Sequence, residues 1–340
     1  MNSRRTFLKL LSIAGFTLPE VLIAKPAAKN IIMTVNGPID AKNIGYTLPH
    51  EHILVDFIGA DQVKPARYNK TDVLKKVTPF LKRAKQNGFD TLVECTPNYL
   101  GRDPELMQTI SRQLGINILT NTGYYGAREN KFIPEHAFDE SAQKLAERWI
   151  HEWKNGLDGT RIKPGFIKIG VDRGSLSEFH RKLVRAAAIT HKNTGLTIAA
   201  HTGPAVGAYE EIEILKEEGV KPDALIWVHA QNEKDMANFV KIAKSGTWVS
   251  LDGVKDNQID DYVARLVHLK ESQQLRRVLV SHDAGWYRPG EPNGGDFRDY
   301  SAIPDLLIPA LKKVNFSQKE IDQIFINNPS EAFTISKKLL

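Results

Sequence analysis

The sequence lacks the features that would hold the fold by covalent cross-links. It also lacks the features that would attach the protein to a membrane or to a nucleic acid. Cys95 is its only cysteine, so an internal disulfide is excluded. No uninterrupted apolar run reaches the roughly 20 residues that a membrane span requires. There is no Lys/Arg tract with interleaved aromatic residues, so nothing indicates a nucleic-acid partner. With 340 residues, 41% hydrophobic, and no linker or low-complexity segment, the chain has the composition of a globular protein.

The N-terminal segment has the pattern of an export signal. Residues 3–9 read SRRTFLK, which matches the twin-arginine pattern S-R-R-x-F-L-K, and a modest apolar stretch with small residues follows. An ordinary amphipathic helix is the alternative, but lysine, proline and glutamate residues interrupt the apolar run. We therefore expect residues 1–28 to be a twin-arginine signal peptide, cleaved after Ala24 or Ala28.

This signal has two consequences for the mature protein, residues 29–340. The twin-arginine (Tat) export machinery carries proteins that are already folded, which suits a periplasmic protein that acquires its cofactor in the cytoplasm. Residues 1–28 contain four basic residues and one acidic residue, so without them the formal charge falls from +6 to +3. The basic character of the full sequence is therefore partly a property of the signal.

Beyond the signal, apolar runs rich in β-branched residues alternate with stretches of helical periodicity. Helical spacing is clear at 72–88, 210–219 and 235–246, and the last two end at a glycine. Eight evenly spaced strands alternating with helices, without a break in composition, predict an α/β fold with a single (β/α)8 TIM barrel. A doubly wound sheet is the alternative, but it does not require eight such strands. The expected strands lie within 47–57, 91–96, 116–125, 165–170, 196–202, 224–230, 247–253 and 277–283.

Six polar residues lie near the C-terminal ends of the predicted strands. Because side chains alternate along a strand, the two histidines of LPHEH point to one face and Glu51 to the other. In barrels of this kind the chemistry takes place at the C-terminal rim. The six residues are His50, His52, Lys168, His201, His229 and Asp283.

Taken singly, most of these residues have an ordinary structural interpretation. A lone histidine after an apolar run, as at His201 and His229, is more often a hydrogen-bonded core residue than a ligand. Asp283 could cap a helix. Lys168 is different, because an ammonium inside GFIKIG needs an anionic partner, a route to solvent or a chemical change that removes its charge. His282 should point to the opposite face and is left out of the site.

Taken together, the sequence resembles the phosphotriesterase-like branch of the amidohydrolase superfamily. The resemblance follows one order along the mature chain: HEH, LGRD (100–103), TGYY (122–125), GLDGTRIKPGFIKIG (156–170), AHTG (200–203), the histidine of the sixth strand, SHD (281–283) and NNPSEAF (327–333). It implies a binuclear metal centre at the C-terminal rim, usually with zinc, although manganese, cobalt and iron accept the same ligands. It places His50, His52 and Asp283 on one ion, His201 and His229 on the other, and an N6-carboxylated Lys168 between them.

The same resemblance implies a reaction. Two metal ions that share one hydroxide lower its pKa and polarise the substrate's carbonyl or phosphoryl oxygen. Asp283 would accept the proton of the hydroxide and pass it to the leaving group. Relatives are often dimers, so a homodimer is expected by analogy.

The substrate is less clearly indicated. Tyr125 falls on the substrate-facing tyrosine of the lactonases in this family, but Gly253 stands where they usually carry an arginine. The segment 284–300 has the aromatic and glycine-rich composition of a binding loop, although a loop that merely covers the barrel would look the same. Its candidates for substrate contact are Trp286, Tyr287, Arg288 and Arg298.

The sequence therefore predicts a periplasmic, metal-dependent hydrolase of a small-molecule lactone or similar carboxylic ester. Hydrolysis of a phosphotriester or an amide by the same centre is the alternative within the enzyme class. A relative that binds metal without catalysis is the alternative outside it, but all six ligand positions are intact.

Overall fold

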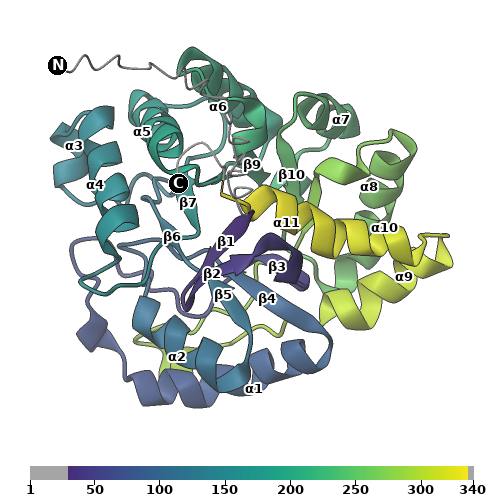
Figure 1. The fold of residues 1–340 in the computed structure, drawn as a ribbon, viewed down its shortest axis with the longest axis horizontal. Coiled ribbons are helices and arrows are strands. Elements are labelled where there is room, and N and C mark those ends of the chain that lie inside the picture. Colours follow the sequence, from purple (N-terminus) through teal and green to yellow (C-terminus); the bar gives the residue numbers. More distant parts are fainter. Residues whose placement is uncertain (1–29, 336–340) are drawn as a thin grey trace, which may run out of the picture.

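The computed structural model describes residues 30–335, so the predicted signal peptide lies outside the described residues. Strands occupy the centre of the molecule and helices surround them (Figure 1). All the central strands pair in parallel. They are β3 (Tyr46–Glu51), β4 (Phe89–Glu94), β5 (Asn117–Leu119), β6 (Asn121–Thr122), β7 (Phe166–Gly170), β8 (Ile198–His201), β9 (Leu225–Val228), β10 (Trp248–Leu251) and β11 (Val278–Val280).

The strands follow one another around the centre in chain order. One sheet has the order β3-β4-β5 and the other β6-β7-β8-β9-β10-β11. Only Thr120 separates β5 from β6, so these two form one strand position with an interruption. Just after β11, the N–H of Asp283 donates to the carbonyl of His50 (3.1 Å), and the N–H of His52 donates to the carbonyl of Ala284 (2.9 Å). The eight strand positions are those of the predicted TIM barrel, and the fold class is confirmed.

The helices pack against the strands through stripes of apolar residues. The Asn69 side chain caps α1, which then buries Val73, Val77 and Leu81 at a spacing of four residues. Among residues 30–335, no helix is both long and apolar enough to cross a membrane. The helices are α1 (Lys70–Gln86), α2 (Pro104–Leu114), α3 (His136–Asp139), α4 (Ala142–Asn155), α5 (Glu178–Thr194), α6 (Ala205–Glu217), α7 (Met236–Lys244), α8 (Ile259–Glu271), α9 (Ile308–Lys313), α10 (Gln318–Asp322) and α11 (Asn328–Phe333).

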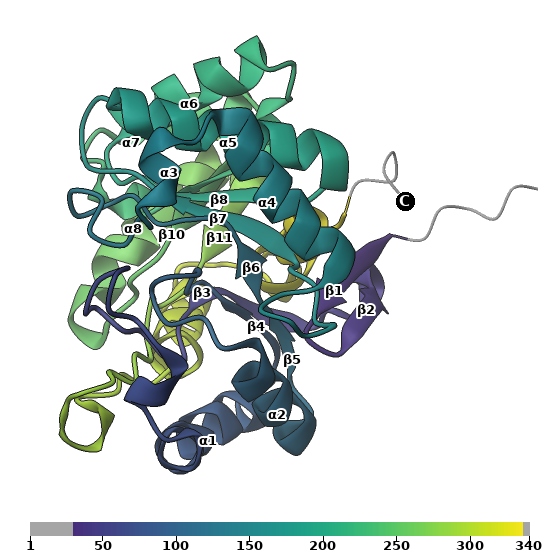
Figure 2. The same ribbon diagram turned by 90° about the vertical axis from the view of Figure 1, so that its left-hand side faces the viewer.

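A hairpin that the sequence did not indicate lies at one end of the barrel (Figure 2). It consists of β1 (Ile31–Thr34) and β2 (Gly37–Asp40), two antiparallel strands of four residues each. Ile32 of this hairpin and Phe333 of α11 belong to the same buried cluster as the inward-facing residues of the barrel strands. The barrel is therefore filled with side chains and closed at this end, which leaves the C-terminal ends of the strands for a cavity.

Candidate metal centre

The six polar residues predicted at the strand ends meet in one cavity. Its volume is about 420 Å³, and it opens at the C-terminal ends of the barrel strands. Apolar and aromatic side chains, among them Val55, Phe57, Leu100 and Trp286, form much of its wall. The polar residues that line it include His50, His52, Lys168, His201, His229 and Asp283.

Four imidazoles and one carboxylate form a continuous arc in this cavity. Ring centroids are 5.4 Å apart for His50 and His52, 5.0 Å for His50 and His229, and 4.4 Å for His201 and His229. Oδ1 of Asp283 lies 3.1 Å from Nε2 of His52 and 3.8 Å from Nε2 of His50. Imidazole and carboxylate are the ligands that zinc and similar divalent ions prefer. The arc can therefore hold such ions.

The protonation states favour metal binding at neutral pH. Burial lowers the pKa of His50, His201 and His229, and the charge of Lys168 acts in the same direction. Burial alone would raise the pKa of Asp283, but the hydrogen bond with His52 and the adjacent imidazoles hold it below its usual range. The three imidazoles are thus neutral and the carboxylate is ionised, which is the form in which each binds a metal.

Lys168 provides the test of whether this site fits a two-metal centre. Its side chain is 1% exposed, and its Nζ has no hydrogen-bond partner among the described residues. Its charge contributes to lowering the pKa of three nearby imidazoles, those of His50, His201 and His229. A buried, unpaired ammonium next to imidazoles is unfavourable. The donor set therefore fits a centre in which cations bind and this nitrogen does not remain a free ammonium.

His52 is held in one orientation by a chain of hydrogen bonds. Thr96 donates from Oγ1 to Oε1 of the buried Glu94 (2.6 Å), so the same hydroxyl accepts from Nδ1 of His52 (2.8 Å). This arrangement directs Nε2 of His52 toward Asp283. Partners of this kind fix the tautomer and ring orientation of metal-binding histidines.

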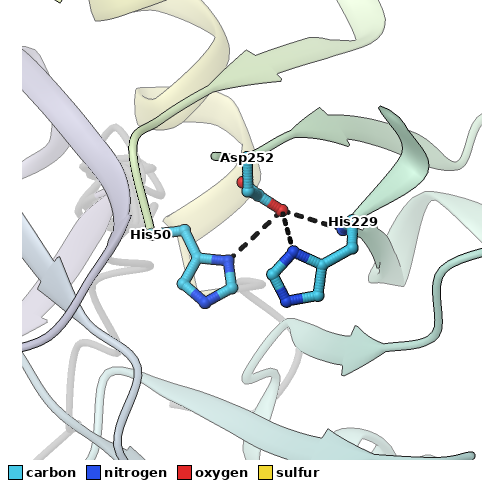
Figure 3. A group of neighbouring side chains, drawn as sticks. All are labelled: His50, His229 and Asp252. Carbon is cyan, nitrogen blue, oxygen red and sulfur yellow. Dashed lines mark hydrogen bonds and ion pairs between the residues drawn. The ribbon is translucent and has the colours of Figure 1, made fainter. Parts of the chain in front are cut away.

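Asp252 lies against the imidazoles of two further histidines, and the sequence did not identify it. Its Oδ2 lies 3.2 Å from Nδ1 of His50 and 3.7 Å from Nδ1 of His229 (Figure 3). The carboxylate also accepts from the N–H of His229 (2.9 Å) and from the hydroxyl of Ser250 (2.7 Å). Because Asp252 is fully buried and does not line the cavity, we interpret it as a residue that orients the ligands. The sequence feature that could have identified Asp252 is its position at the end of the seventh predicted strand, where it is the aspartate of LD in TWVSLDG.

The alternation predicted for the first strand is confirmed by Glu51, which points away from the cavity. This buried carboxylate accepts from Ser281 Oγ (2.8 Å), the N–H of His282 (2.9 Å), His282 Nδ1 (2.7 Å) and the N–H of Ala284 (2.7 Å). His282 faces the same side, and its Nε2 accepts from the N–H of Ile303 (3.0 Å). Glu51 thus fastens the first strand to the segment that carries Asp283.

Of the five candidates for substrate contact, Tyr125 and Trp286 lie in the cavity. The hydroxyl of Tyr125 is 3.1 Å from Nδ1 of His201. Trp286 packs with ring centroids 5.7 Å from His52 and 5.6 Å from Phe57. Its Nε1 is buried and has no hydrogen-bond partner among the described residues, while other atoms of Trp286 line the cavity.

Arg288, another candidate for substrate contact, lies elsewhere. It does not line the cavity, and its guanidinium forms an ion pair with Glu291 (3.0 Å). Arg298 and Tyr287 do not line the cavity either. Both form hydrogen bonds that hold the loop in place. The Arg298 guanidinium donates to the carbonyl of His282 (2.5 Å), and the N–H of Tyr287 donates to the carbonyl of Ile53 (3.0 Å). The loop 284–300 therefore contributes Trp286 to the cavity and uses its other candidates as anchors.

Charged residues of two motifs on which the resemblance rests lie outside the cavity and support the barrel. Arg102 of LGRD has a fully buried side chain that pairs with Glu152 and with Asp158 of GLDG, each at 2.8 Å. Its guanidinium also donates to the carbonyl of Asn121, on the strand that precedes Tyr125 (2.8 Å). These motifs position the third strand rather than contact a substrate.

Comparison with known proteins agrees with this geometry. The family model described as phosphotriesterase family matches residues 30–333. The chain belongs to the phosphotriesterase family. Among solved structures, a triple mutant of the organophosphorus hydrolase from Deinococcus radiodurans superposes with a TM-score of 0.81 at 25% identity, covering 91% of this chain and 99% of that one.

Curated members of the family differ in the activities that their names state. The phosphotriesterase homology protein of Escherichia coli K12 is 31% identical over 294 residues, which cover 85% of this chain and 98% of that protein. The aryldialkylphosphatase of Saccharolobus solfataricus is 30% identical over 307 residues, covering 87% and 97%. The N-acetyltaurine hydrolase of Dictyostelium discoideum is 29% identical over 276 residues, covering 76% and 72%. This chain is accordingly a hydrolase of the phosphotriesterase family.

Proposed function

We propose that this protein hydrolyses lactones or similar carboxylic esters with a pair of divalent metal ions, zinc in the first instance. The observation that carries the proposal is the arc of imidazoles and Asp283 around a buried, unpartnered Lys168 in one cavity. His50, His52 and Asp283 would hold one ion, and His201 and His229 the other. Lys168 would bridge them as a carbamate, because carboxylation turns an unfavourable buried cation into an anion that the ions neutralise.

When bound, the ions supply an activated water and polarise the oxygen of the scissile bond. The protein supplies the remaining steps. Asp283 is ionised and lies at the edge of the arc, so it accepts the proton of the attacking water and passes it to the leaving group. Burial raises the pKa of Tyr125, so its phenol stays protonated and is available to position the substrate.

The choice of a carboxylic ester rests on the position of Tyr125 and on the apolar wall around Phe57 and Trp286. Gly253 marks a difference from the lactonases that carry an arginine there. Its φ is +100°, and a Cβ at this position would lie 3.2 Å from Gln231 Nε2 and 3.3 Å from Tyr262 Oη. An arginine would be strained in this backbone, so the substrate is recognised by other residues.

Phosphotriester hydrolysis is the second candidate. The aryldialkylphosphatase relative and the organophosphorus hydrolase structure favour it, since both names denote enzymes that act on phosphorus esters. The same centre would polarise a phosphoryl oxygen as well as a carbonyl oxygen.

A substrate panel separates these candidates. We expect the metal-loaded mature protein to release protons from at least one of a set of sugar-acid, aliphatic and homoserine lactones. Its kcat/KM for the best lactone should exceed that for diethyl 4-nitrophenyl phosphate and for N-acetyltaurine by more than about tenfold, which corresponds to ~1.4 kcal/mol of transition-state stabilisation. A phosphotriester or an amide as the fastest substrate would contradict the proposal and favour the corresponding relative.

We further propose that the protein reaches the periplasm through the twin-arginine machinery. The proposal rests on the SRRTFLK segment of residues 3–9. Cell fractionation should find the full-length chain processed and periplasmic. The double variant Arg4→Lys and Arg5→Lys should remain unprocessed in the cytoplasm. A wild-type chain that stays full-length in the cytoplasm would contradict this assignment.

A further inference from the structure

Two arginines line the cavity, and neither has an anionic partner among the described residues. Arg128 and Arg173 are exposed, and among the described residues neither guanidinium forms an ion pair or a hydrogen bond. The Arg128 guanidinium lies 5.1 Å from the ring centroid of Phe57, another residue of the cavity wall. By contrast, arginines such as Arg83 and Arg185 pair with carboxylates even on the surface.

Arg128 is presented by an unfavourable backbone. Arg128, Glu129 and Asn130 have φ values of 61°, 57° and 62°, three consecutive non-glycine residues in the left-handed region. The carboxylate of Asp172, just after β7, holds this turn: Oδ1 accepts from the N–H of Arg128 (2.7 Å), and Oδ2 accepts from the N–H of Glu129 (3.2 Å). Strained backbone that neighbouring groups hold in place is concentrated at functional sites.

The next residue after Asp172 is Arg173, so one short segment fixes both arginines at the same rim. Asp172 also lines the cavity and carries a negative charge, but its two oxygens are engaged by the backbone of the Arg128 turn. Arg173 is close enough to His201 for its charge to help lower the pKa of that imidazole, after burial and the nearby His229, Lys168 and His50. The charge of Arg128 acts on Tyr125, which lies 3.1 Å from His201.

We infer that the substrate carries an anionic group, such as a carboxylate, phosphate or sulfonate, which Arg128 and Arg173 bind while the scissile bond lies at the metal centre. This inference rests on the proposed function and specifies its substrate class. The apolar residues Val55, Phe57 and Trp286 would accommodate the segment between the two ends. Arginine is suited to such a role because its planar guanidinium forms paired, charge-assisted hydrogen bonds with oxyanions.

A matched pair of esters tests the inference by turnover. Mono-4-nitrophenyl adipate has a free carboxylate, and methyl 4-nitrophenyl adipate lacks it. We expect Arg128→Gln and Arg173→Gln each to lower kcat/KM for the anionic ester by about tenfold to a hundredfold, the value of a hydrogen bond to a charged group, and to change the neutral ester little. Arg276→Gln is the control, because Arg276 is exposed, forms no ion pair or hydrogen bond among residues 30–335, and lies two residues before β11 at the opposite end of the barrel.

Calorimetry tests the same inference without turnover. Metal-loaded wild-type protein should bind adipate at least about tenfold more tightly than dimethyl adipate, which has no carboxylate, and this ratio should fall by about tenfold in both arginine variants. If the protein hydrolyses neither ester but the ratio of the two affinities is as expected, the hydrolase proposal is rejected and the anion site is retained. Equal affinities in the wild type, or equal losses on both esters in the variants, would overturn the anion site and leave the hydrolase proposal standing.

Discussion

Replacing Asp283 with asparagine should lower kcat by about a hundredfold to ten-thousandfold and leave the barrel folded, since this is the usual range for loss of a general acid or base. Asparagine has nearly the same shape and tolerates the left-handed backbone at this position, where φ is 51°. It retains an oxygen near Nε2 of His52, at present 3.1 Å away. It cannot accept the proton of the attacking water, so the loss falls on catalysis.

The measurement is kcat at saturating metal, with metal content and circular dichroism recorded on the same samples. Saturating metal is needed because Asp283 is also an expected ligand, so its replacement weakens binding as well as proton transfer. Asp256→Asn is the matched control: this aspartate is exposed on the loop before α8 and should give wild-type kinetics. Wild-type turnover by the Asp283 variant would remove Asp283 from the mechanism and favour a protein that only binds metal.

The sequence predicted the barrel and its six rim residues for one physical reason. Strands in a parallel barrel end at the same rim, so a polar residue at the end of each buried strand must meet the others. His201 and His229 were ambiguous alone, but their positions after the fifth and sixth strands placed them together, and the structure shows their rings 4.4 Å apart. Alternation along the first strand also separated His50 from Glu51 correctly.

The residues that the sequence missed or misplaced depend on geometry that strand order does not encode. Asp252, like the other strand-end residues, follows a buried strand. Its carboxylate lies behind His50 and His229 and not in the cavity wall, and strand order alone does not separate these two positions. Arg288 is in the correct loop, yet Glu291 three residues later pairs with it. Arg128 reaches the cavity through a left-handed turn held by Asp172, which no local periodicity indicates.

Replacing Lys168 with methionine should have opposite effects on the metal-free and the metal-loaded protein. In the metal-free protein Nζ of Lys168 is buried and has no hydrogen-bond partner within residues 30–335, so methionine should raise the free energy of unfolding by about 1–3 kcal/mol. In the metal-loaded protein the same change removes the bridging anion. Two cations would then share the site with less compensating charge, so metal occupancy should fall and kcat should drop by at least about a hundredfold.

Thermal unfolding with and without zinc, together with metal analysis and kcat, measures both effects on one protein. Lys255→Met is the control, because Lys255 is exposed and its replacement should change none of these quantities. Added acetate distinguishes the carbamate from a lysine that only packs. If Lys168 acts through a carboxylate, a small carboxylate that enters the space left by the shorter side chain should restore part of kcat in the Lys168 variant and should not stimulate the wild type. A variant that keeps both metals and full kcat without acetate would show that Lys168 is not a bridging ligand, and the two-metal assignment would then rest on the histidines and Asp283 alone.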